Sequence, residues 1–227
     1  MMKTKKITFL LLLLSTTVYS QVQTIEETND STSSWAFLQA VWAFDDGDFE
    51  TAFGWYTISA LQDEKEGQYN LGVCYNRGVG TPKDLTKAVY WFEKSAEQGH
   101  YPAQHNLSLC YYYGIGTPKD YTKSFYWVKK CAEQGVKEGQ YLLAMHYYKG
   151  YGTLLDGTKA FFWAKKSAEQ GYPSAQLLLG ELYYRGMGTL KDYKKAAYFV
   201  RQAYENGSEF DIKQAKELWE ERELWKY

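Results

Sequence analysis

Hydrophobic and polar positions between residues 65 and 208 follow one pattern in four consecutive copies of 36 residues. Each copy opens with a small residue and a Gln, and Leu and Tyr follow four and eight positions after the small residue. These spacings place the side chains on one face, so the pattern predicts an amphipathic helix at the start of each copy. The four sets are Gly67, Gln68, Leu71, Tyr75; Ala103, Gln104, Leu107, Tyr111; Gly139, Gln140, Leu143, Tyr147; and Ala175, Gln176, Leu179, Tyr183.

A second helix is predicted in the latter half of each copy. The first helix ends at a Gly-x-Gly turn, because glycine adopts the positive φ needed to leave a helix. A Thr follows the turn, with an Asp three residues later, and either the Thr, in a capping box, or the Asp itself caps the next helix. Along that helix a small residue and an aromatic residue three positions later are predicted to be buried. These pairs are Ala88 and Trp91, Ser124 and Trp127, Ala160 and Trp163, and Ala196 and Phe199.

One short phrase closes the copies: KSAEQG at 94–99, KCAEQG at 130–135, KSAEQG at 166–171 and the similar AYENG at 203–207. A glycine in this position is typical of a helix end, so the phrase predicts a stop before the next copy. A period of this size is typical of solenoids, in which neighbouring copies stack on one another. Four helix-turn-helix repeats are therefore predicted, at residues 65–100, 101–136, 137–172 and 173–208.

This pattern, A-Q-x-x-L-G…Y-x-x-G-x-G…D-x-x-K-A-x-x-W, resembles the Sel-one-like repeat (SLR) family, a longer-looped relative of the tetratricopeptide repeat. The resemblance covers residues 65–208, and the fourth copy departs most, with Phe199 in place of Trp and Tyr204 in place of Ala. It implies an all-α fold, a right-handed α-solenoid of stacked helix-turn-helix repeats. It also implies that the first helices of the repeats line the concave wall.

Both flanks of the repeats are predicted to extend the same stack. Residues 34–64 are expected to form an N-terminal tetratricopeptide-like unit, since their apolar pattern aligns with a second helix one period upstream. Residues 209–227 are expected to form a C-terminal capping helix, because one apolar face and a charged remainder suit the open end of a stack. Residues 33–227 together are expected to form one elongated α-solenoid domain.

The N-terminal residues 1–20 are predicted to be a secretory signal peptide. Three lysines precede an apolar run from Ile7 to Leu14, and small residues follow at the cleavage position before Gln21. The run is shorter than the roughly 20 apolar residues that span a bilayer, although an uncleaved anchor remains the alternative. Residues 21–33 are polar and acidic and are expected to form a flexible leader. The protein is thus expected in the periplasm or outside the cell, with no membrane insertion after cleavage.

Charge and cysteine content exclude some classes of function. Without the three signal lysines the chain has 23 basic residues (26 minus 3) against 27 acidic ones, which argues against a nucleic-acid partner. Cys74, Cys110 and Cys131 are expected to be free, buried thiols. Cys74 and Cys110 stand at equivalent points of successive helices, and helix packing puts such points about 10 Å apart, which is too far for a disulfide.

No catalytic or metal-binding motif occurs in the sequence. The Gly-x-Gly turns lack the preceding strand and the third glycine of a dinucleotide site, and no metalloprotease, serine-hydrolase or C-x-x-C motif is present. His146 stands where other copies have Cys74, Cys110 and Leu182, so it is predicted to be packed inside rather than to bind a metal. No cofactor is expected. A weak cell-wall or ester hydrolase remains the enzymatic alternative.

The candidate partner-binding residues are the positions of the first helices that vary between copies and are expected to face the concave groove. Tyr, Met and Arg are enriched at protein interfaces, which favours such a role. The alternative is that these tyrosines are tolerated on the surface or pack on neighbouring repeats. The candidates are Tyr69, His105, Tyr141, Leu109, Met145, Tyr112, Tyr148, Tyr184, Arg77, Tyr113, Lys149 and Arg185.

The sequence thus predicts an exported, monomeric, non-catalytic scaffold that binds a polypeptide partner in its concave groove. The basic residues beside the tyrosines favour a partner with an acidic segment. A periplasmic inhibitor or immunity-type protein that caps a toxic enzyme is the second candidate.

Export has a direct test. The protein recovered from the periplasm or the medium is expected to have the mass of a chain that begins at Gln21, because the signal peptide is removed during translocation. Intact-mass measurement of each cell fraction checks this. A full-length chain confined to the cytosol would show that residues 1–20 are not a cleaved signal.

Overall fold

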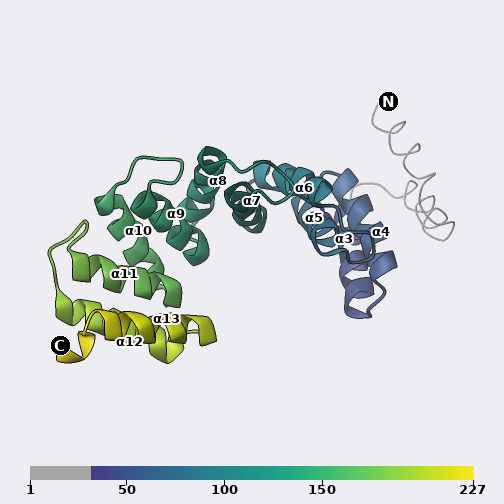
Figure 1. Cartoon of the computed structure of the whole chain (residues 1–227). Helices are drawn as coiled ribbons and strands as arrows, with labels where there is room; N and C mark the ends of the chain where they lie inside the picture. Colours follow the sequence, from purple (N-terminus) through teal and green to yellow (C-terminus); the bar gives the residue numbers. More distant parts are fainter. Residues whose placement is uncertain (1–31) are drawn as a thin grey trace. The chain divides into compact units, whose positions relative to one another are not determined.

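The computed structural model describes residues 32–227, so the predicted signal peptide and nearly all of the leader lie outside the described residues. Within 32–227 the chain forms eleven α-helices and one 3-10 helix, with no strand (Figure 1). They are α3 (Thr32–Asp45), α4 (Phe49–Leu61), α5 (Lys65–Arg77), α6 (Leu85–Glu97), α7 (Tyr101–Tyr113), α8 (Tyr121–Glu133), α9 (Lys137–Lys149), α10 (Gly157–Glu169), α11 (Pro173–Arg185), α12 (Tyr193–Asn206), α13 (Glu209–Glu221) and η1 (Leu224–Lys226). Helix α3 begins at Thr32, so the last two residues of the predicted leader are helical.

The described residues divide into two compact units. Unit 1 comprises residues 32–110 together with Gly114–Pro118, and unit 2 comprises Tyr111–Tyr113 together with Lys119–Tyr227. In unit 1, α4 packs on α3 and α5, and α5 packs on α6; in unit 2, each helix from α8 to α12 packs on the next. This succession of packed helix pairs confirms the all-α solenoid class. Within the described part of the chain, no helix has the length and apolar character needed to cross a membrane.

The two glycines of each turn have different tasks, which the first turn of this type illustrates. Gly78 is the C-cap of α5 and is left-handed, with φ 74°. Gly80 also has a positive φ, and a Cβ atom there would overlap the carbonyl oxygen of Phe49, the first residue of α4. The turn therefore lies against the start of the preceding second helix, and this contact leaves no room for a side chain. The same overlap applies to Gly116 with Leu85, Gly152 with Tyr121, and Gly188 with Gly157.

The Asp residues, not the Thr residues, cap the second helices. The side chain of Asp84 accepts a hydrogen bond from the backbone N–H of Lys87 at 3.0 Å, which satisfies a donor of the first helical turn. The hydrogen bond from this backbone N–H lowers the pKa of the Asp84 carboxyl. Equivalent bonds join Asp120 to Lys123, Asp156 to Lys159, and Asp192 to Lys195.

In the first and third copies the closing phrase also joins the two helices of the repeat. The Ser95 hydroxyl donates to the carbonyl oxygen of Lys65 at 2.6 Å, and the Gln98 side-chain amide donates to the Gln68 side chain at 2.9 Å. The third copy repeats both bonds, from Ser167 to Lys137 and from Gln170 to Gln140. The phrase is therefore both a helix end and a link to the first helix.

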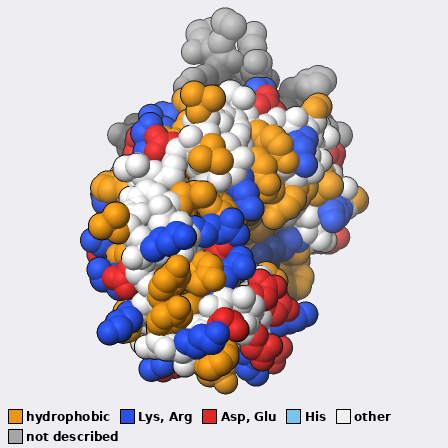
Figure 2. Space-filling model, turned by 60° about the vertical axis from the view of Figure 1, so that its left-hand side comes forward, with side chains coloured by type: hydrophobic (Ala, Val, Ile, Leu, Met, Phe, Trp, Pro, Cys, Tyr) orange, Lys and Arg blue, Asp and Glu red, His pale blue; other side chains and the backbone are white. Residues whose placement is uncertain are grey.

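The core follows the repeated pattern. The four leucines of the first helices are fully buried, and so are the small residues of the second helices. Trp127 is buried, with 7% of its surface exposed, whereas Trp91 and Trp163 are half-buried. The three cysteines are buried and free, as predicted. On the outer side of the second helices, Tyr90, Tyr126, Phe162 and Tyr198 are exposed. Figure 2 shows hydrophobic side chains interspersed with Lys and Arg over the face that it displays.

Replacing Trp127 by Ala is expected to lower the free energy of unfolding by about 3–5 kcal/mol, because a large buried side chain is lost and a cavity remains. Trp219→Ala on α13 is expected to cost less, since Trp219 is half-buried and a terminal element has fewer neighbours. Urea titration of both variants measures the difference. Equal losses, or no loss for Trp127→Ala, would contradict the stacked arrangement.

Candidate functional site

A pocket of about 460 Å³ lies in unit 1, with α5 and α7 contributing most of its walls. We call it the unit 1 groove. Among its residues are three of the predicted binding residues, Tyr69, Arg77 and Leu109. The full lining is Phe44, Tyr56, Tyr69, Asn70, Val73, Cys74, Asn76, Arg77, Val79, Phe92, Asn106, Leu109, Cys110 and Ile115.

The helical period explains why these residues share one wall. On α5, Tyr69, Val73 and Asn76 lie four and three positions apart and form one stripe, and the buried Leu71 lies on the opposite side of the helix. Tyr69 also packs against the rings of Phe92 on α6 and of His100. Val73 and Asn76 are half-buried and line the groove.

Three Asn side chains in the groove retain donors or acceptors without a hydrogen bond to a described residue. The Asn70 side chain donates to the Glu66 carbonyl at 2.9 Å, and its own oxygen makes no bond to a described residue. The Asn106 amide donates to the Tyr69 hydroxyl over a long 3.4 Å, and the Asn76 amide has no partner within residues 32–227. A peptide unit presents one donor and one acceptor, and an Asn side chain matches both. The groove is therefore suited to the backbone of an extended polypeptide.

Arg77 supplies the positive charge at the end of α5. It is exposed, and no carboxylate in the described part of the chain forms an ion pair with it. Between Arg77 and the amides, Val73 and Leu109 provide apolar surface. The arrangement combines a place for an apolar side chain, amides for a backbone and a cation for an acidic group.

Two thiols line the same groove without being reactive. Burial raises the pKa of the Cys74 thiol to about 11 and that of the Cys110 thiol to about 11. Both therefore stay protonated near neutral pH, and the thiolate is the nucleophilic form. Burial likewise raises the pKa of Cys131, in unit 2, to about 12. Among the described residues, no group of three or more His, Cys, Asp or Glu side chains comes together to hold a metal ion.

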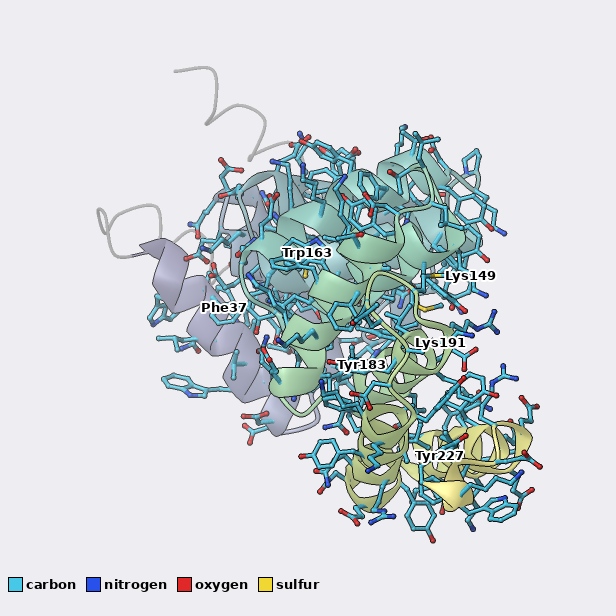
Figure 3. The ribbon with its side chains drawn as sticks, turned by 90° about the vertical axis from the view of Figure 1, so that its left-hand side faces the viewer. Phe37, Lys149, Trp163, Tyr183, Lys191 and Tyr227 are labelled. Carbon is cyan, nitrogen blue, oxygen red and sulfur yellow. The ribbon has the colours of Figure 1, made fainter. Side chains whose placement is uncertain are left out.

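The predicted residues of the second and third copies have different surroundings. His105 is half-buried on α7, with its Nδ1 3.4 Å from the Asn106 side-chain oxygen. Tyr141 is half-buried against the ring of Tyr172, and burial raises the pKa of its hydroxyl to about 12. Met145 and Tyr148 pack beside the unit 2 core. The ammonium of Lys149, a residue labelled in Figure 3, lies over the Tyr148 ring at 4.8 Å.

Tyr112 belongs to an aromatic cluster rather than to a free row of tyrosines. Its ring lies 5.3 Å from Tyr121 and 5.5 Å from Tyr151, and those two rings stack on each other at 4.8 Å. Burial, with a hydrogen bond to the Tyr151 side chain, raises the pKa of Tyr112 to about 12. The packing alternative therefore applies to Tyr112, whereas its neighbour Tyr113 remains exposed.

In the last copy, residues that follow α13 contact the side chains at the corresponding positions of α11. Glu181 on α11 forms an ion pair with Arg185 and a second with Arg222, the residue after α13. Burial alone would raise the pKa of Glu181, but hydrogen bonds from Arg222 and Arg185 lower it overall. The Arg222 guanidinium also lies over the Tyr184 ring at 5.3 Å. Tyr184 and Arg185 are thus engaged within the protein.

Aromatic stacking completes this C-terminal cover. Tyr227, labelled in Figure 3, stacks on Tyr193 at 5.0 Å, and Tyr193 in turn contacts Tyr184. Leu224 of η1 is fully buried in the core cluster of unit 2. Of the predicted residues, the structure therefore brings Tyr69, Leu109 and Arg77 together in the unit 1 groove. Four others pack against one core cluster of unit 2: Tyr141, Met145, Tyr148 and Tyr184.

Comparison with known proteins identifies the repeat. The family model described as the Sel1 repeat matches residues 46–64, 65–100, 102–136, 137–172 and 173–208. The chain belongs to the Sel1 repeat family. Sel1 repeats generally serve as scaffolds for protein–protein interaction.

Solved Sel1 repeat structures share the fold. A Sel1 repeat protein from Oxalobacter formigenes is 30% identical, with a TM-score of 0.75 over 86% of this chain and 83% of that one. A protective antigen of uropathogenic Escherichia coli strains, which displays an SLR fold, is 29% identical with a TM-score of 0.75, over 84% of this chain and 42% of that one. The DAP3-binding cell death enhancer 1 of Rattus norvegicus is 44% identical over 43 residues, so the match spans 19% of this chain and 8% of that relative.

A buried Ser–His pair in unit 2 was not foreseen from the sequence. The Ser124 hydroxyl lies 3.2 Å from His146 Nε2, and His146 Nδ1 lies 2.7 Å from the Tyr151 carbonyl oxygen. A carbonyl only accepts, so Nδ1 carries the proton and Nε2 accepts from Ser124. Both side chains are buried, which keeps a substrate away from the hydroxyl. The sequence of this Sel1 repeat protein does hold a clue to the pair. Both positions become polar together, since Ser124 and His146 stand where the next copies have Ala160 and Leu182.

The stability of this repeat is expected to fall in mild acid. Burial lowers the pKa of His146, so below the unfolded-state pKa of about 6.5 the unfolded chain takes up a proton that the folded chain excludes. The free energy of unfolding should therefore decrease as the pH falls through about 6.5 and should be independent of this group above it. Urea titrations at about pH 7.5 and about pH 5.5 measure the change.

A double variant isolates this effect from His100, whose pKa burial also lowers. Ser124→Ala with His146→Leu reproduces the natural pair Ala160 and Leu182. This variant is expected to lose less stability between the two pH values than the unmodified protein. An identical pH dependence would mean that His146 does not titrate with unfolding.

Proposed function

We propose that this Sel1 repeat protein is a non-catalytic interaction protein that binds an extended polypeptide segment in the unit 1 groove. The observation that supports this most is the combination of apolar surface, spare Asn amides and an unpaired Arg77 in one pocket. An apolar side chain of the partner lies between Val73 and Leu109, and its backbone bonds to Asn70, Asn76 or Asn106. An acidic residue of the partner pairs with Arg77.

The groove meets the requirements of a peptide site in size and character. Its volume of about 460 Å³ lies within the range of ligand pockets, and it is lined by apolar side chains with a few polar groups that fix orientation. Charged groups at such a site steer association and select partners more than they add affinity. In this proposal the apolar contact provides most of the affinity, and Arg77 provides the selectivity for an acidic partner.

Export, proposed from the sequence, would bring the protein to a partner in the periplasm or outside the cell. The enzymatic alternative has less support, since the Ser–His pair of unit 2 is buried and the groove thiols stay protonated. The proposed work of the protein is binding.

The last copy of the chain suggests the decisive variant. There Glu181 stands four residues before Arg185 and pairs with it, whereas Val73 stands four residues before Arg77. Val73→Glu is expected to give Arg77 an internal partner and to put a negative charge where an acidic segment would bind. Affinity for such a partner should fall at least ~10-fold, about 1.4 kcal/mol.

Partner identification and controls make the test specific. A photo-crosslinking residue at position 109 should capture the partner in its native compartment, and one at the exposed position 126 of α8 should not. Titration of that partner then compares Val73→Glu with the uncharged Val73→Gln. Both variants lose the apolar contact of Val73, so the further loss of affinity in Val73→Glu measures the effect of the added charge. Both variants should unfold at nearly the same temperature as the unmodified protein. Equal affinities for all three proteins would place the binding site elsewhere.

A further inference from the structure

The first described helix, α3, exposes several of its large apolar side chains. Ala36 and Ala40 are fully buried against α4. Trp35, Leu38 and Trp42, spaced by three and four residues, form a stripe with 40%, 45% and 59% of their surfaces exposed. Helix α3 is thus apolar on its outer face as well as on its inner one, where Phe37 packs against the core. We call Trp35, Leu38 and Trp42 the α3 stripe.

Helix α13, the last α-helix of the stack, has the polar outer surface that α3 lacks. Helix α13 buries Ala215 and exposes charged side chains, among them Lys213, Lys216 and Glu217. A terminal element of a repeat stack needs such a polar outer face to remain in water. Residues 35–44 hold no charged residue at all. A large apolar face of this kind marks an interaction site.

Charge around the α3 stripe indicates which partner fits. Residues 32–64 contain six acidic residues, Asp45, Asp46, Asp48, Glu50, Asp63 and Glu64, and no Lys, Arg or His. Asp45 and Asp46 follow Trp42 by three and four positions, so they continue the stripe at its C-terminal end. Both are exposed, and neither forms an ion pair with a residue of the described chain. The face is therefore apolar with an acidic edge.

We propose that the α3 stripe binds a basic amphipathic helix of a partner protein. Such a helix covers the apolar stripe with its own apolar face and places Lys or Arg beside Asp45 and Asp46. A second copy of this chain fits less well, because the same face would bring acidic edges together. The residues just upstream carry Glu26, Glu27 and Asp30 and have the same sign.

This site is separate from the unit 1 groove. None of the α3 stripe residues lines the groove, whose nearest contribution from α3 is Phe44. Variants of the stripe and variants of Val73 therefore test the two proposals independently. Failure of one leaves the other standing.

Two synthetic peptides serve as probes. Each is an amphipathic helix of about 18 residues, long enough to be helical in water, with a leucine face; one carries lysines on its polar face and the other glutamates. Fluorescence anisotropy of the labelled peptides measures binding to the purified protein. The lysine peptide is expected to bind at least ~10-fold more tightly than the glutamate peptide, and added salt should weaken its binding.

Two variants of the protein locate the binding. Leu38→Gln with Trp42→Gln removes two of the three residues of the α3 stripe and keeps Trp35, which packs edge-on against Trp55. Asp45→Asn with Asp46→Asn removes the charged edge and leaves the stripe in place. Each is expected to weaken the lysine peptide at least ~10-fold, and the second should bring the two peptides closer in affinity. The matched control, Tyr90→Gln with Tyr126→Gln, changes two aromatic residues of similar exposure and should bind as before.

Several outcomes would overturn the proposal. Equal binding of the two peptides, or an equal loss in the Tyr90 and Tyr126 control, would show non-specific adhesion. Absence of binding would mean that the protein's own residues cover the face or that it takes no helix. A dimer in sedimentation that Leu38→Gln with Trp42→Gln dissociates would make a second copy the occupant.

Discussion

The contact between each Gly-x-Gly turn and the first residue of the preceding second helix sets the geometry of the repeat. At Gly80 it is a backbone-to-backbone contact with Phe49, which no change of side-chain rotamer can relieve. The same turn is closed from within by a hydrogen bond of 2.9 Å from the Asp84 N–H to the Tyr75 carbonyl. One turn thus sets where the next helix begins and how closely the repeat packs on the preceding helix pair. This packing determines which face of each helix is buried.

Local patterns predicted this framework well because it depends on neighbours in sequence. Helix period, turn glycines and caps are short-range features, and each is contained within a single repeat. The choice between Thr and Asp caps stayed open, since both stand at suitable spacings and only the hydrogen bond from Lys87 to Asp84 decides. The Ser95 bond to Lys65 was missed because it joins residues 30 positions apart.

The candidate site was predictable only in part, for the same physical reason. Asn76, Tyr112 and Tyr184 occupy the same position of the repeat, yet their neighbours differ. Tyr112 meets the rings of Tyr121 and Tyr151, and Tyr184 meets Arg222 from beyond the last repeat. Asn76 meets no such neighbour and lines an open groove. The repeat period determines on which face of a helix a residue lies. The residues that differ between copies determine whether that face is covered by other side chains or remains accessible.

The last repeat supplies an internal comparison for the first. Glu181 and Arg185 stand one turn apart on α11, and the chain adds Arg222 so that the half-buried carboxylate has two cations. A buried carboxylate without such partners would be costly, and its lowered pKa shows that the cations outweigh burial. In the first repeat the acid is absent and the cation remains, exposed and without a carboxylate from the described chain. Among the described residues no carboxylate pairs with Arg77 as Glu181 pairs with Arg185, and this difference between the two repeats is the reason for proposing a carboxylate of a partner at Arg77.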